Sequence, residues 1–397
     1  MNTRKNIAWT RAFAVVVLLS MGLLMGCKSD DGKSVRPFLS EPYPEKLSAW
    51  RLFVGTPASM TPNQGVIPYE LNTPLFTDYA EKYRTIWMPK GKKADYREGD
   101  VLAFPVGTII SKTFYYRRED MKDARAKIPV AQAAFAKLPA ADRPLHKHPF
   151  LLETRLLVHT SDGWVALPYV WNEKQTEAVL EIAGEKKVMH LNRGGKKVGF
   201  DYFVPNQNQC SGCHVRQARQ GKEIKFKKTL RPIGPKPSNL NREYPYVAGK
   251  INQLAKLTQA GYLQGAPAAD KTPRMAVWNK PKTGSLDARA RAYLDANCAH
   301  CHSAIGPAST SGLHLDMENK IAAKLGVCKT PIAAGRGSGG RLHDIVPGKP
   351  DKSILFYRMA SKEADVMMPE LGKTLVHDEG VALMRAWISA MKGGCDS

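Results

Sequence analysis

Two copies of the pattern C-x-x-C-H constrain this chain more than any other feature. They read Cys210-Ser211-Gly212-Cys213-His214 and Cys298-Ala299-His300-Cys301-His302. Two thiols three residues apart, followed directly by an imidazole, form the attachment pattern of a c-type haem. The sequence therefore predicts two covalent haems, bonded to Cys210 and Cys213 and to Cys298 and Cys301. In this interpretation His214 and His302 bind the two irons.

Other uses of the two cysteine pairs stay open. The four thiols are compatible with a structural zinc site or with redox dithiols. A zinc site would not explain why a histidine follows each pair, and a dithiol oxidoreductase does not need one there. His300, inside the second motif, is interpreted as a spacer residue.

The first 27 residues are typical of a bacterial lipoprotein signal. Arg4, Lys5 and Arg11 accompany the uncharged apolar run 12–25, which leads into Gly26 and Cys27. The run is short for a membrane-spanning helix. We expect a signal peptide at 1–26 and a lipid on Cys27, which anchors an exported, periplasm-facing protein in the cell envelope. The alternative is an uncleaved anchor in which Cys27 is buried. Residue 28 is Lys and not Asp, which favours the outer membrane over the inner one.

The composition indicates a folded protein with a large excess of positive charge. Hydrophobic residues make up 43% of the 397 residues and charged residues 24%, which excludes a wholly disordered chain. A net charge of +23 requires an anionic partner, surface or cofactor. Haem carboxylates would account for part of it, and the basic segment 215–242 could screen these carboxylates, dock acidic redox proteins or be a solvated surface. Because the protein is expected to be exported, we do not expect a nucleic-acid partner.

The sequence changes from strand-like patterns to helix-like patterns along the chain. This change predicts an α+β, multidomain protein. We expect a tether at 27–45, a β-rich, sandwich-like domain at 46–205, a first haem segment at 206–284 and a mainly helical, cytochrome c-like domain at 285–397. Strands are predicted at 83–88, 107–116, 154–158 and 164–167, the last two as a hairpin. Helices are predicted at 286–297, capped by Ser285, and at 378–391, with a further helical insertion in the Ala-rich stretch 122–142.

The C-terminal part resembles the single-haem domain of class I cytochromes c. A helix, the second C-x-x-C-H motif, a loop and a closing helix follow in that order. In that family a Met before Pro in the loop is the sixth iron ligand, and the resemblance maps this role to Met368, which precedes Pro369. Its neighbour Met367 is the alternative.

Two cysteines, Cys328 and Cys395, remain after the haem and lipid assignments. In an oxidising compartment they predict a disulfide that holds the C-terminal helix to the loop region. Two free thiols are the alternative.

The first motif has no comparable sixth ligand. The open possibilities in the sequence are His146, His148, His159, His190, Met189 and Met275. An empty sixth position would permit reaction with small molecules.

Most of the mature chain resembles a family of bacterial dihaem c-type cytochrome lipoproteins. Besides the two motifs, the resemblance rests on Tyr69–Leu75, Tyr169–Asn172, Ile233–Lys236, Arg291–Asp295 and Met368-Pro369. It implies haem binding and electron transfer without an established substrate, so we expect an electron carrier rather than an enzyme with its own substrate. The alternatives are a dihaem peroxidase-like oxidoreductase with an open first haem, and a β domain that binds a partner while the haems transfer electrons.

Overall fold

The computed structural model describes residues 34–55, 57–122, 149–220 and 223–395, and residues 35–397 form one compact unit. The predicted signal peptide, Cys27, His146, His148 and nearly all of the Ala-rich stretch 122–142 lie outside the described residues. Among the helices that are described, none is long and apolar enough to span a membrane.

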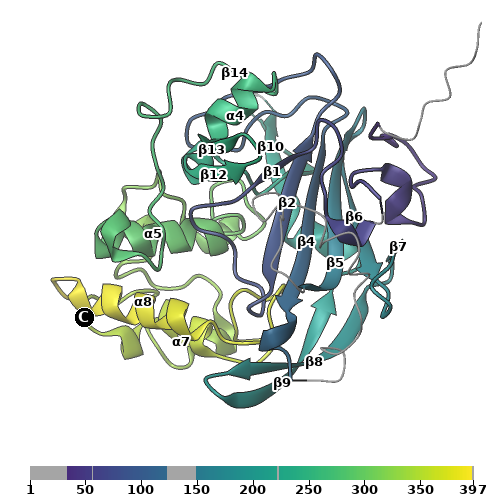
Figure 1. Ribbon diagram of the computed structural model, residues 1–397. Helices are drawn as coiled ribbons and strands as arrows, with labels where there is room; N and C mark the ends of the chain where they lie inside the picture. Colours follow the sequence, from purple (N-terminus) through teal and green to yellow (C-terminus); the bar gives the residue numbers. More distant parts are fainter. Residues whose placement is uncertain (1–33, 56, 123–148, 221–222, 396–397) are drawn as a thin grey trace, which may run out of the picture. The chain divides into compact units, whose positions relative to one another are not determined.

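A six-stranded antiparallel sheet forms the centre of this unit (Figure 1). In spatial order its strands are β1 (Ile67–Tyr69), β2 (Glu81–Trp87), β4 (Ile109–Arg117), β5 (Pro149–Thr160), β6 (Gly163–Trp171) and β7 (Ala178–Leu180). The predicted strands and the predicted hairpin, now β5 and β6, are confirmed, but β5 begins five residues before and β6 ends four residues after the predicted bounds. The large sheet together with the helices confirms the α+β class.

Residues 35–62 cover one face of the sheet. Their apolar side chains form a core with the strand residues that point to this face, among them Leu156 and Tyr169. The Trp50 indole donates a hydrogen bond to the Tyr169 hydroxyl (2.7 Å), and Phe38 packs edge-on against Trp50. Val35 is also buried in this core, so the described end of the expected tether lies against the sheet.

The opposite face is apolar at its two ends and charged in its middle. One end packs against the segment 240–263, which carries Leu240, Leu254 and Leu263. The other end packs against the hairpin of β8 (Glu185–Arg193) and β9 (Lys196–Val204). Residues from both sides of position 205 therefore share cores with the sheet.

The expected sandwich is not what the sheet forms. Among the described residues, every other sheet has only two strands. A second large sheet would need a continuous apolar surface to pack on, and the charged middle of this face does not provide one. Hairpins, loops and helices cover it instead.

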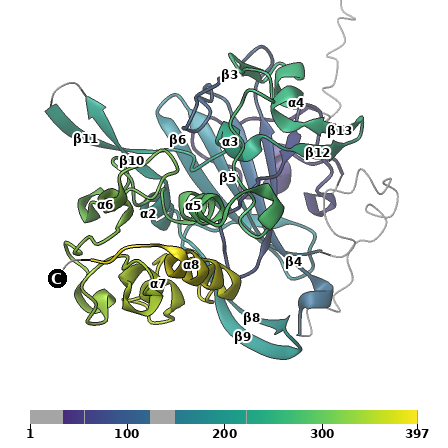
Figure 2. The ribbon, with the colours of Figure 1, turned by 90° about the vertical axis from the view of Figure 1, so that its left-hand side faces the viewer.

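The helices α5 (Leu286–Asn297), α7 (Ile354–Ala360) and α8 (Asp378–Ala390) lie together on this side of the sheet (Figures 1 and 2). The Ser285 hydroxyl accepts a hydrogen bond from the Ala288 amide (3.1 Å) and caps α5, as predicted. The Trp387 indole donates to Asp287 (2.8 Å) and holds α8 against α5. Both predicted helices are confirmed.

Short elements connect these parts. They are the 3₁₀ helices η1 (Leu47–Trp50), η2 (Pro57–Ser59), η3 (Arg118–Asp120), η6 (Asn208–Cys210), η7 (Pro281–Thr283), η8 (Ser309–Ser311), η9 (Gly335–Ser338) and η10 (Pro350–Lys352), the α-helices α2 (Ser211–His214), α3 (Pro237–Leu240), α4 (Gln253–Gln259) and α6 (Ala322–Leu325), and the strands β3 (Ala94–Asp95), β10 (Val215–Gln220), β11 (Glu223–Leu230), β12 (Glu243–Tyr246), β13 (Gly249–Asn252) and β14 (Leu263–Gln264).

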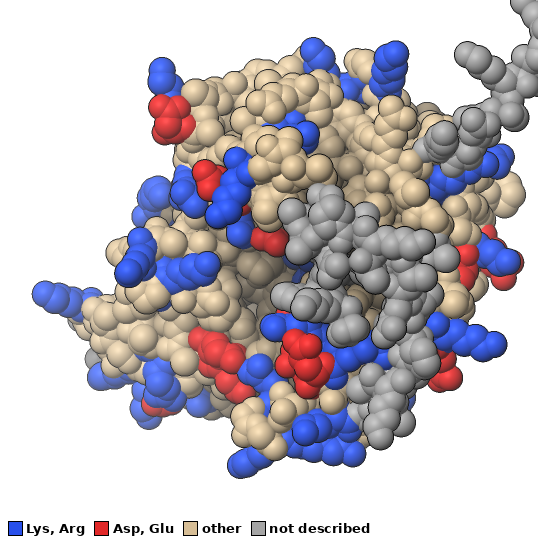
Figure 3. All heavy atoms as spheres, viewed as in Figure 1, with Lys and Arg blue, Asp and Glu red and all other residues tan. Residues whose placement is uncertain are grey.

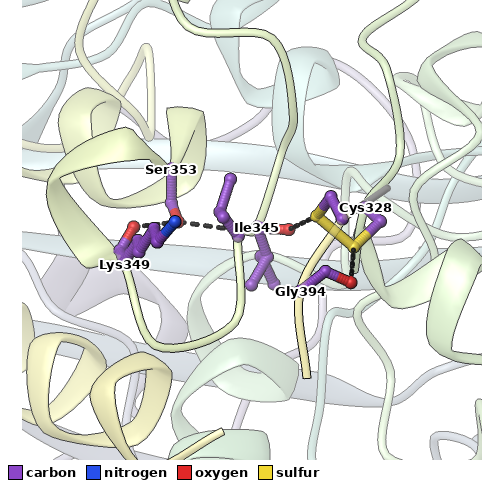
Figure 4. The surroundings of a disulfide bond; sticks show 7 residues. Cys328, Ile345, Lys349, Ser353 and Gly394 are labelled. Carbon is purple, nitrogen blue, oxygen red and sulfur yellow. Dashed lines mark hydrogen bonds between the residues drawn. A yellow bond between two sulfur atoms is a disulfide. The ribbon is translucent and has the colours of Figure 1, made fainter. Parts of the chain in front are cut away.

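Cys328 and Cys395 form a disulfide (Figure 4). Their Cα atoms lie 5.2 Å apart although 67 positions separate them in the sequence. The bond ties the residues that follow α8 to the segment before α7, where the Cys328 amide also donates to the Ile345 carbonyl (2.9 Å). Closing a loop of this length stabilises a fold by about 4 kcal/mol.

Candidate functional site

The fold brings the two C-x-x-C-H motifs into contact. The Cys301 thiol donates a hydrogen bond to the Gly212 carbonyl (3.6 Å), and the Arg216 guanidinium donates to the His300 carbonyl. Just beyond the motifs, the Gln217 amide donates to the Ile305 carbonyl (2.9 Å). Two motifs far apart in the sequence therefore make a single site beside the sheet.

At the centre of this contact Cys213, His300 and Cys301 converge. Their ligand atoms all lie within 4.8 Å of one another. A hydrogen bond with the Cys301 thiol, and then the nearby His300, lower the pKa of Cys213. The interpretation of His300 as a spacer missed this position, because its neighbour Cys213 belongs to a distant segment and no local pattern announces it.

Each motif histidine is fixed through its Nδ1 atom. His214 Nδ1 lies 2.9 Å from the Arg231 carbonyl, which can only accept, so Nδ1 carries the proton. His302 Nδ1 lies 3.1 Å from the Ser311 hydroxyl, which itself donates to the Ala308 carbonyl (2.7 Å). Nδ1 is again the donor. In both rings the lone pair is therefore on Nε2, as in metal-binding histidines whose other nitrogen is held by the protein.

Burial keeps both imidazoles neutral. It lowers the pKa of His214 to about 4, and the positive charge of Lys112 acts in the same direction. It also lowers the pKa of His302 to about 4, with Arg358 adding to the effect. A neutral imidazole is the form that binds a metal, so both rings are in the binding state near neutral pH.

Met368 lies in the loop between α7 and α8, as the sequence order requires. Its amide donates to the Arg358 carbonyl (3.0 Å), and both Met367 and Met368 are half-buried. Farther along this loop, a methyl carbon of Leu371 would lie 3.0 Å from a Cβ on Gly212, so the loop reaches the first motif. The role of Met368 as a ligand stays a prediction.

The described side chains considered as a sixth ligand for the first motif make their contacts elsewhere. His159 stacks on Trp164, and its Nδ1 lies 3.0 Å from the Phe104 carbonyl. Met189 is buried among the aromatic residues of β9, and Met275 packs with Ala292 of α5. His190 belongs to β8 and lies against Gly199.

A buried amine suits a cofactor that carries carboxylates. Lys373 is 8% exposed, and its Nζ has no hydrogen-bond partner within the described part of the chain. Burial lowers its pKa, while Asp78 and Cys298 oppose that effect. Together with two neutral histidines whose Nε2 atoms are free to bind, this unpaired cation fits a haem, which brings both an iron and carboxylates.

No protein-family model, curated protein or solved structure matches this chain.

Proposed function

We propose that this protein is an exported cytochrome that holds two covalent c-type haems and transfers electrons in the cell envelope. The observation that carries the proposal is the state of the two motif histidines, both neutral and both fixed at Nδ1. A structural role for these imidazoles would not require that both leave Nε2 available directly after a pair of thiols.

Seven side chains would hold the two groups. Cys210, Cys213 and His214 serve the first, and Cys298, Cys301, His302 and Met368 serve the second. Haem iron supplies a one-electron redox change, and a thioether ligand raises its reduction potential relative to a second imidazole. Met368 would thus give the second haem a higher potential than bis-imidazole ligation would.

The contact between the motifs supports a transfer function over catalysis at a single centre. Because the Cys213 and Cys301 sulfur atoms lie within 4.8 Å of each other, groups bonded to them are neighbours. Two haems bonded to these motifs would therefore lie side by side, which supports electron transfer between them.

The proposal extends to location and partners. A lipid on Cys27 would anchor the protein in the outer membrane, and the Cys328–Cys395 disulfide suits the oxidising periplasm. The excess of Lys and Arg, visible on one face in Figure 3, would attract acidic redox proteins. The C-terminal helices would form a class I cytochrome c-like haem domain.

One specific observation favours a second candidate, a metal site. Cys213, His300 and Cys301 are within reach of a single ion, and zinc takes thiolate and imidazole ligands. Such a site would leave Cys210, Cys298 and both fixed histidines without a role, so we rank it below the haem proposal.

The test is the spectrum of the protein matured in a host that attaches c-type haems, recorded reduced and then with carbon monoxide. We expect c-type haem absorption that does not respond to carbon monoxide, because in a carrier the sixth ligand position of each iron is filled. A haem that binds carbon monoxide would contradict the pure carrier and direct attention to peroxide chemistry. Absence of covalent haem would contradict the whole proposal.

The Met368 assignment has a matched control in its neighbour. Met368→Ala should remove the thioether ligand, so we expect the reduction potential of one haem to fall and that haem to bind carbon monoxide. Met367→Ala should leave both properties unchanged. The opposite pattern would transfer the role to Met367.

A further inference from the structure

Three cations converge on one aromatic ring in the charged middle of the sheet. The side-chain charges of Lys82, Lys112 and Arg155 lie 5.7, 5.0 and 4.5 Å from the centre of the Phe114 ring. We call Lys82, Arg84, Lys112 and Arg155 the cationic belt.

The register of the strands makes this arrangement unfavourable by itself. Arg84 is the direct partner of Lys112, and Lys112 is the direct partner of Arg155. Three cations thus lie side by side across three neighbouring strands. Like charges at directly opposed positions destabilise a sheet, so a row of this kind calls for a compensating anion.

Within the described part of the chain, Glu153 is the one carboxylate in ion-pair contact with the cationic belt, while Asp78 and Glu70 act on Lys82 and Arg84 from farther away. Glu153 is fully buried, accepts two hydrogen bonds from Arg155 (2.6 and 2.7 Å) and accepts a third from the Tyr202 hydroxyl (2.7 Å). Among the described residues, Lys82, Arg84 and Lys112 have no carboxylate within ion-pair distance. Lys82 donates a hydrogen bond to the Ala80 carbonyl (2.7 Å). Glu153 and Arg155 neutralise each other, whereas burial and the neighbouring cations lower the pKa of Lys82 and Lys112, so an anion bound beside these two amines would favour their charged form.

The belt lies beside the first C-x-x-C-H motif. Burial raises the pKa of Cys210, and the charges of Arg155 and Lys112 oppose that effect. Burial also lowers the pKa of Lys112 to about 7, with further lowering by Arg155 and Arg84, although the side chain stays partly exposed. Because solvent still reaches the Lys112 side chain, a ligand can reach it too.

We propose that Lys82 and Lys112, backed by Phe114 and Arg155, form a binding site for a carboxylate or a small oxyanion. Two sources have this chemistry. The first, the carboxylates of a haem at the first motif, rests on the proposed function. The second, a free oxyanion that binds next to the redox site, does not.

The test uses the full matured chain and three variants. Lys112→Met removes the central amine, Lys112→Arg keeps the charge, and Lys90→Met alters an exposed lysine in the loop after β2. Binding of inorganic phosphate is measured by calorimetry at constant ionic strength. The reduction potential of each haem is measured between pH 5 and 8, and haem is counted in a denatured sample.

A free oxyanion source predicts that phosphate binds to wild type and to Lys90→Met and Lys112→Arg, and roughly tenfold more weakly to Lys112→Met. A haem carboxylate source predicts no phosphate binding. In that case Lys112→Met should lower the potential of one haem and make it depend on pH, because the freed carboxylate then titrates, whereas Lys90→Met should not.

The proposal would be overturned if Lys112→Met and Lys90→Met showed the same phosphate affinity and the same haem potentials. If Lys112→Met does not fold, Lys82→Met removes the neighbouring amine and is judged in the same way. A sample without covalent haem would contradict the proposed function alone, since phosphate binding still tests the belt.

Discussion

Two polar regions beside the same sheet differ in how their hydrogen-bonding groups are satisfied. The first is the seam where residues 70–73 meet residues 238–253. There the Gln253 side chain pairs with both the amide and the carbonyl of Glu70 (2.7 and 2.9 Å), and the Asn239 side chain does the same for Thr73 (2.8 and 3.0 Å). The second is the cationic belt, where Lys82, Arg84 and Lys112 have no carboxylate within ion-pair distance among the described residues.

This difference indicates which region holds the fold together and which region can bind a ligand. Each side-chain amide of the seam makes the two backbone hydrogen bonds that a neighbouring strand would otherwise make. Such pairing rigidifies a fold and leaves nothing to offer a ligand. The belt keeps unpaired charge at a comparable depth, which costs stability unless something else supplies the anion. We therefore assign the seam to folding and the belt to binding.

Breaking the seam should have the largest effect. Gln253→Ala leaves the amide and carbonyl of Glu70 and the carbonyl of Leu240 without this partner, and we expect the free energy of unfolding to fall by about 3 kcal/mol. Urea denaturation measures it. Gln259→Ala, at the exposed end of the same helix, should change stability by less than about 0.5 kcal/mol. Equal losses in both variants would remove the special role of the seam.

His377 is an intermediate case, since burial disfavours its charged form although Glu379 Oε2 lies 3.8 Å from its Nε2 and opposes that effect. Its ring stacks on Phe76 (4.1 Å between centres), and its Nδ1 lies 2.9 Å from the Tyr293 hydroxyl. Burial lowers its pKa from 6.5 to about 4. The unfolded chain therefore binds a proton that the folded one resists, and the contribution of this histidine is present above pH 6.5 and lost as the pH falls toward 4.

The expected loss from this one histidine is about 2 kcal/mol between pH 7 and pH 5. His377→Gln should reduce the pH dependence of the unfolding free energy of the matured protein by that amount. His314→Gln, outside this aromatic stack, should leave the dependence unchanged. A His377→Gln profile that follows wild type would contradict the assigned cause.

Replacing Lys373 should have the smallest effect. Lys373 represents the second kind of polar group, a buried charge without a partner. Its amine is buried and unpaired, so Lys373→Met should raise the unfolding free energy of the haem-free chain by about 1 kcal/mol. Lys362→Met, at an exposed position of the same loop, should have no effect. A destabilised Lys373→Met chain would show that the amine already has a partner inside the protein.

Local patterns predicted the elements that local forces determine. Helices α5 and α8 follow from apolar spacing and from the Ser285 cap, and β5 and β6 follow from alternation around a turn. The pairing of Cys328 with Cys395 was the arrangement left after the other cysteines had been assigned.

What the sequence could not provide depends on segments that meet only in the folded chain. The proximity of Cys213 to His300 joins two motifs, the belt needs the register of three strands, and the seam needs Gln253 to reach Glu70. The segment Tyr69–Leu75 was recognisable but had no physical explanation until Asn239 and Gln253 were seen to bind its backbone. The sandwich expectation was wrong because the charges of Lys82, Lys112 and Arg155 share one face, which no single strand reveals.

The central claim is that each C-x-x-C-H motif holds a haem, and the most direct measurement is the mass of the denatured chain after maturation, with iron and zinc determined on the native sample. We predict a chain that carries two covalent haems, two irons and no zinc, and a single haem in the double variant Cys210→Ala/Cys213→Ala. An unmodified chain that binds zinc through Cys213, His300 and Cys301 would contradict the account.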